Sequence, residues 1–463
     1  MSKKRIIGGI LGVAVLVVFL LLKPDQEVWK PEAMAFLGCL CMAVIWMVFN
    51  FVPDYVAAIT MCTMWVVFKS VPIGTAFNQF NGSTVWIMIG ALILGTAAGQ
   101  CGFLKRCALL MMKALPATYS GQCLAFVFSG VVLTPLIPST AAKSTIIPPM
   151  VLANAESLGI QPHSKPAKGI FLAYYIGYIT TAVCFLSGSF ISYSLNGVIA
   201  DAAVVTWMNW FLWSIVFLVS NVVLMILIIL LWYRPKEKIE ISKEFVTKQL
   251  DEMGVWTWQQ KLTGITLVSC LVLWIFERAL NIPSWAVACI GAMLLMVCNV
   301  MTVKDLRAKI PWDSILMIGC FVGVGSVATA VGIDATVRTL LGDTLGKLMS
   351  NPFLLIIVLS VVTWVLRSVL TSMTTATTIT TVLLLPLCAS YGIHPWILIF
   401  VGYASGNIWW LIYQTAPSIL SFAATDNKLV THSETIAGSV QFAVTCLVAL
   451  LISIPYWQLL GLL

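Results

Sequence analysis

The chain has 463 residues, of which 60% are apolar and only 10% are charged, whereas soluble domains carry roughly 25% charged residues. This composition excludes disorder, a coiled coil, collagen and a disulfide-stapled secreted domain, and its long apolar runs favour a polytopic all-α membrane protein over an outer-membrane barrel. The net charge is +8, and the basic residues form no cluster of the kind that nucleic acid binding needs, so nucleic acid is excluded as a partner. In a membrane protein a basic excess is typical of cytoplasmic loops.

The N-terminus predicts an uncleaved first membrane helix. The basic residues Lys3, Lys4 and Arg5 precede an apolar run over 6–22. A signal peptide would continue into a small-residue cleavage site, but Lys23 and Pro24 follow this run. We therefore predict a multi-pass protein of the inner or plasma membrane with its N-terminus in the cytoplasm.

Further apolar runs follow along the chain, and several are too short or too interrupted by Gly, Pro and Ser/Thr for a regular span of about 20 residues. We predict about 11 spanning helices and two re-entrant hairpins. The stretch 234–261 differs, because it holds six Lys/Arg and five Asp/Glu in 28 residues. It predicts a cytoplasmic connector between two halves, giving four units: N-terminal scaffold helices (1–72), a first repeat (73–233), the connector (234–261) and a second repeat (262–463).

Three features recur in the same order in both halves, with an offset of about 230 residues. NGSTVWIMIG (81–90) is similar to IPWDSILMIG (310–319), and a Ser/Thr cluster ending in Pro occurs in both 133–149 and 366–386. SGSFISYSLN (187–196) is then matched by YQTAPSILS (413–421). Repeated halves with broken helices are typical of secondary transporters.

The Ser/Thr clusters are the candidate sites. A hairpin tip that stops inside the membrane leaves backbone groups unpaired, so it must face water, substrate or protein. Its free amides and positive helix end suit a carboxylate, and its carbonyls and hydroxyls suit a small cation. Close helix packing is the alternative explanation for one such cluster, but two clusters at matching places favour a site.

The paired clusters resemble the Ser-Asn-Thr signatures of the divalent anion/sodium symporter (DASS) family. AFNQFNGSTVWIMIGALILGTA (76–97) is similar to the family's segment before the first hairpin, and IPWDSILMIG to the equivalent position in the second half. The resemblance implies transport of di- or tricarboxylates, two inverted repeats whose hairpin tips form the site, and a homodimer. We expect both tips to move together across a fixed scaffold.

The family motifs carry over residue by residue. The first tip lacks the family's Asn, and Met373 stands where the second Asn is expected, which leaves the anion's identity open because Met cannot replace an amide donor. The resemblance implies these substrate-binding residues: Ser139, Thr140, Ser372, Met373, Thr374, Ser187, Thr415 and Pro417. If sodium is the coupling ion, it is expected near Ser139, Ser189, Ser372 and Thr415.

Lys143 follows the first cluster inside apolar surroundings, where an ionised side chain needs a partner or a role. The exchanger branch of the family has a basic residue just after the first signature. This resemblance implies that Lys143 compensates substrate charge in place of sodium, while snorkelling or pairing with an acid is the alternative. Arg367 lies four residues before Thr371 and poses the same question without matching a motif.

The sequence predicts a secondary active transporter of organic divalent anions, with a small anion and lipid as its partners. We favour anion exchange, with sodium-coupled symport and an anion channel as alternatives. No enzyme is expected, because no His lies near a candidate nucleophile and no Walker motif is present. The thirteen cysteines show no metal-ligand spacing, so we expect no cofactor other than sodium ions.

Overall fold

The structure is a computed structural model that describes residues 3–22, 29–235 and 244–463. Within these residues every regular element is a helix, and nine helices are long and apolar enough to cross a membrane. Four further apolar helices have only 10–17 residues, which is why this number is smaller than the 11 spans expected from sequence. The prediction of an all-α polytopic membrane protein is confirmed.

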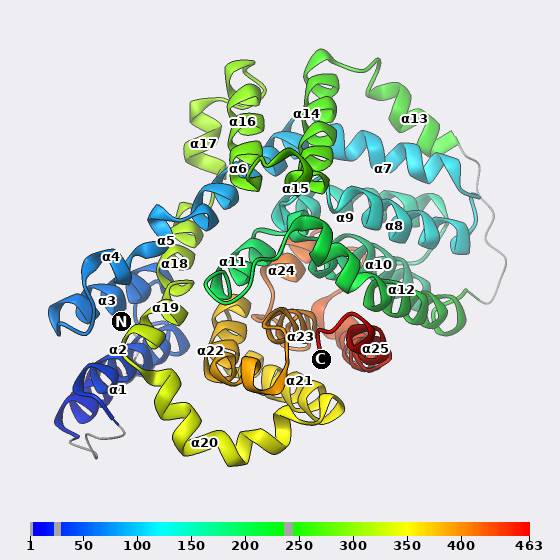
Figure 1. Cartoon of the computed structure of the whole chain (residues 1–463). Helices are drawn as coiled ribbons and strands as arrows, with labels where there is room; N and C mark the ends of the chain where they lie inside the picture. Colours follow the sequence, from blue (N-terminus) through cyan, green and yellow to red (C-terminus); the bar gives the residue numbers. More distant parts are fainter. Residues whose placement is uncertain (1–2, 23–28, 236–243) are drawn as a thin grey trace.

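The first helices form one group at the edge of the molecule, where α1 packs on α2 and α2 on α3 (Figure 1). Two short helices then lead into the first repeat. The bounds in this part of the chain are α1 (Lys3–Leu21), α2 (Pro31–Val48), α3 (Asp54–Val67), α4 (Ile73–Ala76) and α5 (Asn78–Asn81).

Each half then contains a long segment that packs against helices of the other half. In the first half it is α6, which contacts α16, and in the second half it is α18, which contacts α3. The bounds are α6 (Ser83–Gln100), α7 (Phe103–Ala114), α14 (Trp258–Ile275), α15 (Glu277–Leu280), α16 (Ser284–Val297), α17 (Val303–Lys309), α18 (Trp312–Phe321), α19 (Val324–Ala330) and α20 (Ile333–Met349).

The remaining order of elements occurs twice: a helix pair with a short turn, a helix broken in the middle, and a long helix. In the first half these are α8 (Tyr119–Leu133), α9 (Thr140–Ser157), α10 (Lys165–Tyr178), the 3-10 turns η1 (Thr180–Cys184) and η2 (Leu186–Gly188), α11 (Phe190–Val198) and α12 (Trp207–Trp232). In the second half they are α21 (Pro352–Val369), α22 (Met373–Tyr391), α23 (Trp396–Gly406), α24 (Ala416–Ala423) and α25 (His432–Leu459).

The two halves exchange contacts through their broken helices. Helix α24 of the second half packs against α9 of the first, and α11 of the first half packs against α22 of the second. Figure 1 shows α11 and α24 in the middle of the molecule, and the long helices α12 and α25 pack on each other. This reciprocal arrangement agrees with the two inverted repeats predicted from the sequence.

The charged connector contains one described helix, α13 (Glu244–Glu252), while residues 236–243 lie outside the described part. Arg106 of α7 donates to the carbonyls of Met253 at 2.8 Å, Gly254 at 2.9 Å and Val255 at 3.4 Å. The connector is thereby attached to the first half.

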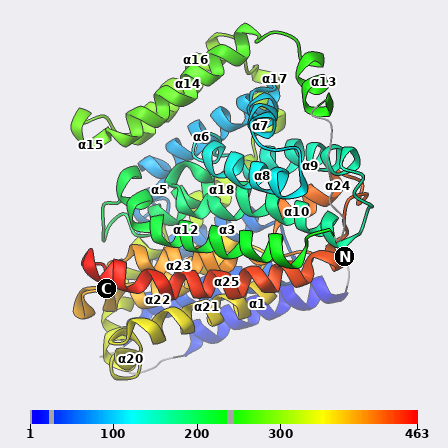
Figure 2. The same ribbon diagram turned by 90° about the vertical axis from the view of Figure 1, so that its right-hand side faces the viewer.

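Figure 2 shows the two termini at opposite ends of the long helices, with α13 on the side of the N-terminus. The four-unit division remains a prediction.

A glycine pair sets the distance between the first hairpin and its broken helix. Gly130 of α8 crosses Gly177 of α10 so closely that a Cβ at Gly130 would lie 2.2 Å from the Gly177 carbonyl carbon. Small residues allow membrane helices to approach in this way. The broken helix is therefore held against the hairpin by backbone contact.

We expect Gly130→Ala to destabilise the protein by about 1–3 kcal/mol, the usual range for overpacking a dense core. The added methyl group has no free volume, so α8 and α10 must separate. Thermal unfolding of the purified protein in detergent measures the effect. The control is Gly74→Ala, since nothing lies within 4 Å of a Cβ there. Equal melting temperatures for the two variants would contradict the prediction.

Candidate substrate site

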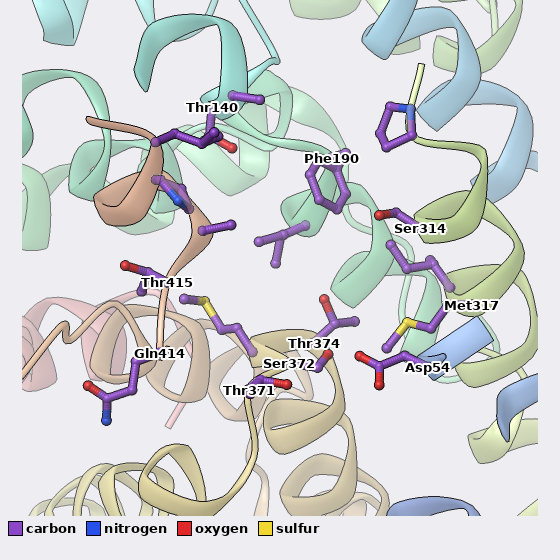
Figure 3. A pocket seen from close by; sticks show the side chains of 18 of the residues that line it. Asp54, Thr140, Phe190, Ser314, Met317, Thr371, Ser372, Thr374, Gln414 and Thr415 are labelled. Atoms are coloured by element: carbon purple, nitrogen blue, oxygen red, sulfur yellow. The ribbon is translucent and has the colours of Figure 1, made fainter. Parts of the chain in front are cut away.

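The amino ends of four helices meet at a cavity of about 460 Å³ (Figure 3). It is lined by the first residues of α9, α11, α22 and α24, two helices from each half. A helix amino end carries unpaired N–H groups and a partial positive charge. Four such ends around one space form a site suited to an anion.

The residues at these four helix starts are Ser and Thr residues of the two predicted tips and of the two broken helices. Ser139 and Ser372 accept hydrogen bonds from the amides of Ala142 and Thr375, each at 3.2 Å, and so cap α9 and α22. Ser189 caps α11 in the same way, while Thr415 is the cap residue of α24. The sequence clusters therefore fold as caps because they begin helices inside the protein.

The two tips contribute unequally to the cavity wall. The second tip places Thr371, Ser372, Met373 and Thr374 on the wall. The first tip supplies Thr140, while Ser139 lies outside the lining, packed beside α6 at Gly95. Figure 3 shows the hydroxyls of Thr140 and Thr374 directed into the cavity from opposite sides. The structure thus brings together residues that are more than 200 positions apart in sequence.

The unwound segments of the broken helices also differ. Thr415 and Pro417 line the cavity, whereas Ser187 and Ser189 do not. Ser187 is buried, donates to the Pro135 carbonyl at 2.7 Å and accepts from the Trp207 indole at 2.8 Å. Its hydroxyl therefore fixes the first hairpin turn to the unwound segment and makes no contact with the cavity.

Lys143 is completely buried behind the first tip and does not line the cavity. Its Nζ donates to the Gly188 carbonyl at 3.1 Å and to the Thr134 hydroxyl at 3.4 Å. Within the described residues no ion pair joins Lys143 to a carboxylate at 4 Å or less. The ammonium occupies a carbonyl- and hydroxyl-lined position of the kind that a small cation would take.

Arg367 is the basic residue that lines the cavity from the second half. It is also completely buried, and its guanidinium donates to the carbonyls of Gly406 at 3.2 Å and Leu370 at 3.0 Å. It also donates to the carbonyls of Thr371 and Gln414. Gly406 and Gln414 lie 39 and 47 residues after Arg367, so no motif around Arg367 could have indicated these two acceptors.

Several lining residues were not selected from the sequence. Tyr175 of α10 reaches across to the second half, where its hydroxyl lies 3.1 Å from the Thr415 hydroxyl. Asp54 of α3 and Asp313 of α18 form part of the opposite wall, which comes from the outer helices. These residues carry no local pattern that distinguishes them from packing or helix-start residues, because only the fold brings them to the cavity.

The unwound backbone beside the site is paired by the long helix that follows it. In the first half Trp210 donates to the Val183 carbonyl and Ser214 to the Cys184 carbonyl, both at 2.8 Å. In the second half the Trp409 amide donates to Ser439 at 2.7 Å. Helices α12 and α25 therefore supply the partners that the interrupted helices cannot supply themselves.

The described part of the chain has no group of three or more His, Cys, Asp or Glu placed to hold a metal ion. A sodium ion would have to use hydroxyl and carbonyl oxygens, which suit a hard cation. Such oxygens are present at the tips, but Lys143 and Arg367 already donate to several of them.

We expect Thr140→Ala and Thr374→Ala each to weaken binding of a dicarboxylate anion roughly tenfold or more, because a hydrogen bond to a charged group contributes about 1.5–3 kcal/mol. Ligand-induced thermal stabilisation of the purified protein measures the change. Thr145→Ala is the control, since its exposed hydroxyl bonds to carbonyls of its own helix. Unchanged stabilisation in both cavity variants would remove these hydroxyls from the site.

Comparison with known proteins gives a family match over almost the whole chain. The family model described as "Sodium:sulfate symporter transmembrane region" matches residues 3–463. The chain is 24% identical over 320 residues to a putative malate transporter of Bacillus subtilis, which covers 67% of both chains. It is 27% identical over 273 residues to an uncharacterized transporter of Haemophilus influenzae, covering 57% of this chain and 56% of that protein.

A chloroplastic dicarboxylate transporter of Spinacia oleracea is 21% identical over 274 residues, covering 57% of this chain and 48% of that protein. The chain thus spans about half to two thirds of the curated relatives it matches. Among solved structures, the YdaH transporter of Alcanivorax borkumensis has a TM-score of 0.57 at 15% identity, covering 84% of this chain and 88% of that one. MtrF of Neisseria gonorrhoeae has a TM-score of 0.52 at 12% identity, covering 97% and 94%. At these identities the likeness concerns the fold alone.

Proposed function

Since the chain belongs to the sodium:sulfate symporter transmembrane family, we propose that it is a secondary carrier of small organic dianions of the dicarboxylate class. The membership confirms the family resemblance read from the Ser/Thr clusters and places the chain among transporters rather than enzymes. Relatives named as malate and dicarboxylate transporters support the substrate class.

The observation that carries this proposal is the meeting of four helix amino ends at one cavity. A dicarboxylate has a negative charge at each end, and each repeat contributes two helix amino ends to the cavity. Each carboxylate can therefore face one pair of helix starts. The hydroxyls of Thr140, Thr374 and Thr415 supply further hydrogen-bond partners.

We favour exchange of one anion for another over sodium-coupled symport. A dianion crossing a low-dielectric region needs compensating positive charge. Lys143 supplies a fixed charge at the first tip, where its ammonium bonds to oxygens of Thr134 and Gly188. An empty site with a fixed positive charge resists reorientation, so the carrier returns only with another anion. Sodium symport is the second candidate, because the family's description names sodium.

An anion channel is the alternative from another class. A channel needs a continuous pore with fixed rings or filters. The repeated halves and the interrupted helices that meet at one cavity favour a carrier instead.

We further propose a homodimer in the cytoplasmic membrane with the N-terminus in the cytoplasm. Lys3, Lys4 and Arg5 begin α1, and the connector helix α13 lies on the same side of the long helices as the N-terminus (Figure 2). Basic residues at short membrane-flanking segments stay in the cytoplasm.

This orientation predicts that a reporter placed within 244–252 reports the cytoplasm, whereas a reporter fused after Leu463 reports the opposite side. The charged connector and the basic start of α1 should both resist translocation. Paired fusions of alkaline phosphatase and a fluorescent protein at the two sites make the measurement. A cytoplasmic signal after Leu463 would show that the orientation or the number of crossings is different.

The exchange proposal predicts that labelled dicarboxylate enters sodium-free proteoliposomes only when unlabelled dicarboxylate is inside. Lys143→Ala should lose this dependence on internal anion. Lys143→Arg, which keeps the charge, should retain it, and thermal unfolding shows whether each variant is folded. Uptake into empty vesicles that follows a sodium gradient would establish symport instead.

A further inference from the structure

The two buried cations make corresponding contacts in the two repeats, although they project from opposite helices of their hairpins. Lys143 lies on α9, after the first tip, and Arg367 lies on α21, before the second tip. Lys143 projects from a helix of the first hairpin and donates to the carbonyl of Gly188, the residue just before the cap of α11. Arg367 projects from a helix of the second hairpin and donates to the carbonyl of Gln414, the residue just before the cap of α24. Each cation also bonds to its own hairpin turn, at Thr134 in the first half and at Leu370 in the second.

The two positions differ in their relation to the cavity. Arg367 lines it, and Lys143 does not. A guanidinium has five N–H donors, with two on each terminal nitrogen. The Nε and Nη1 donors all bond to carbonyls, whereas Nη2 makes a single hydrogen bond within the described residues, to Gln414. One N–H of Nη2 therefore has no acceptor among the described residues.

The charge of Arg367 is also uncompensated. The described residues place no carboxylate within 4 Å of its guanidinium, and all of its hydrogen-bond acceptors are neutral carbonyls. A buried cation in a membrane protein normally has a partner. The cavity beside Arg367 is the place where an anionic partner can bind.

We infer that Arg367 binds a carboxylate of the substrate and makes the site selective for doubly charged anions. The inference rests on the proposed function and extends it, because Arg367 and Lys143 together give the site two fixed positive charges. A dianion neutralises both charges, so the loaded site crosses the membrane without net charge. A monoanion of the same size leaves one charge uncompensated and is a poor substrate.

A purely structural role for Arg367 is the competing explanation, since its carbonyl contacts join the second hairpin to its broken helix. The chain offers a matched control in Arg106. This arginine is also buried and donates to three carbonyls, as against four for Arg367, but it lies on α7 outside the cavity lining. Arg106→Gln therefore removes a carbonyl-anchoring arginine without touching the site.

The test compares a dicarboxylate with a ligand of the same length and one charge. Wild-type protein in proteoliposomes preloaded with succinate takes up labelled succinate, and unlabelled succinate or its monoamide competes. We expect the concentration of monoamide that halves uptake to be at least tenfold higher than the concentration of succinate that does so. Arg367→Gln should lower the ratio of these two concentrations at least tenfold relative to wild type, and Arg106→Gln should leave the ratio unchanged.

A second variant keeps the positive charge and tests the inference even if Arg367→Gln does not fold. Arg367→Lys should raise the KM for succinate at least fivefold while retaining the preference for the dianion, and Arg106→Lys should do neither. A folded Arg367→Gln variant with the wild-type ratio, or an Arg367→Lys variant with the wild-type KM, would overturn the inference.

A separate readout distinguishes this inference from the proposed function. If wild-type protein takes up no succinate, the proposed transport function fails. Thermal stabilisation of the detergent-purified protein by succinate and by the monoamide then measures binding without transport. Stronger stabilisation by succinate that is lost in Arg367→Gln supports the role of Arg367. Equal stabilisation by both ligands in the wild type overturns it.

Discussion

The structure depends on one constraint: polar backbone groups inside the membrane must be paired. Two helices of this chain are interrupted, over η1 and η2 in the first half and over 407–415 in the second. Each interruption leaves carbonyls and amides without helical partners. The following long helix pairs some of them, through Trp210 and Ser214 in one half and Ser439 in the other. The amino ends that remain form the cavity, so the interruption and the site have the same cause.

The basic side chains complete the pairing of these carbonyls. Lys143 and Arg367 each donate to the carbonyl just before the second part of a broken helix, at Gly188 and Gln414. Sodium ions could fill the same role with the same oxygens. A side-chain cation differs because it cannot leave, and its charge remains when the substrate dissociates. In the proposed carrier, coupling would therefore depend on whether a bound ion or a side chain holds these carbonyls.

The sequence was sufficient for the all-α fold, the family and the position of the helix starts. Ser139 and Ser372 stood out because Ser/Thr clusters in apolar surroundings are local patterns, and both residues cap helices at the tips. The cavity wall was less predictable. Lys143 drew attention because it follows a motif, yet Arg367 is the cation that lines the cavity. The carbonyls that hold Arg367 lie as far as 47 residues away, and only the folded chain brings them together.

The hydrogen bonds also determine which parts can move as one body. Arg367 joins the second hairpin to its broken helix, and Ser187 joins the first hairpin turn to the unwound segment of the first half. Tyr175 then connects the two halves through Thr415. A movement that preserves these bonds carries both tips together, as expected for a carrier. Asp54 and Asp313 belong to the outer helices α3 and α18, so such a movement changes their distance from the anion. Their negative charges disfavour an anion on that wall and favour it at the four helix ends.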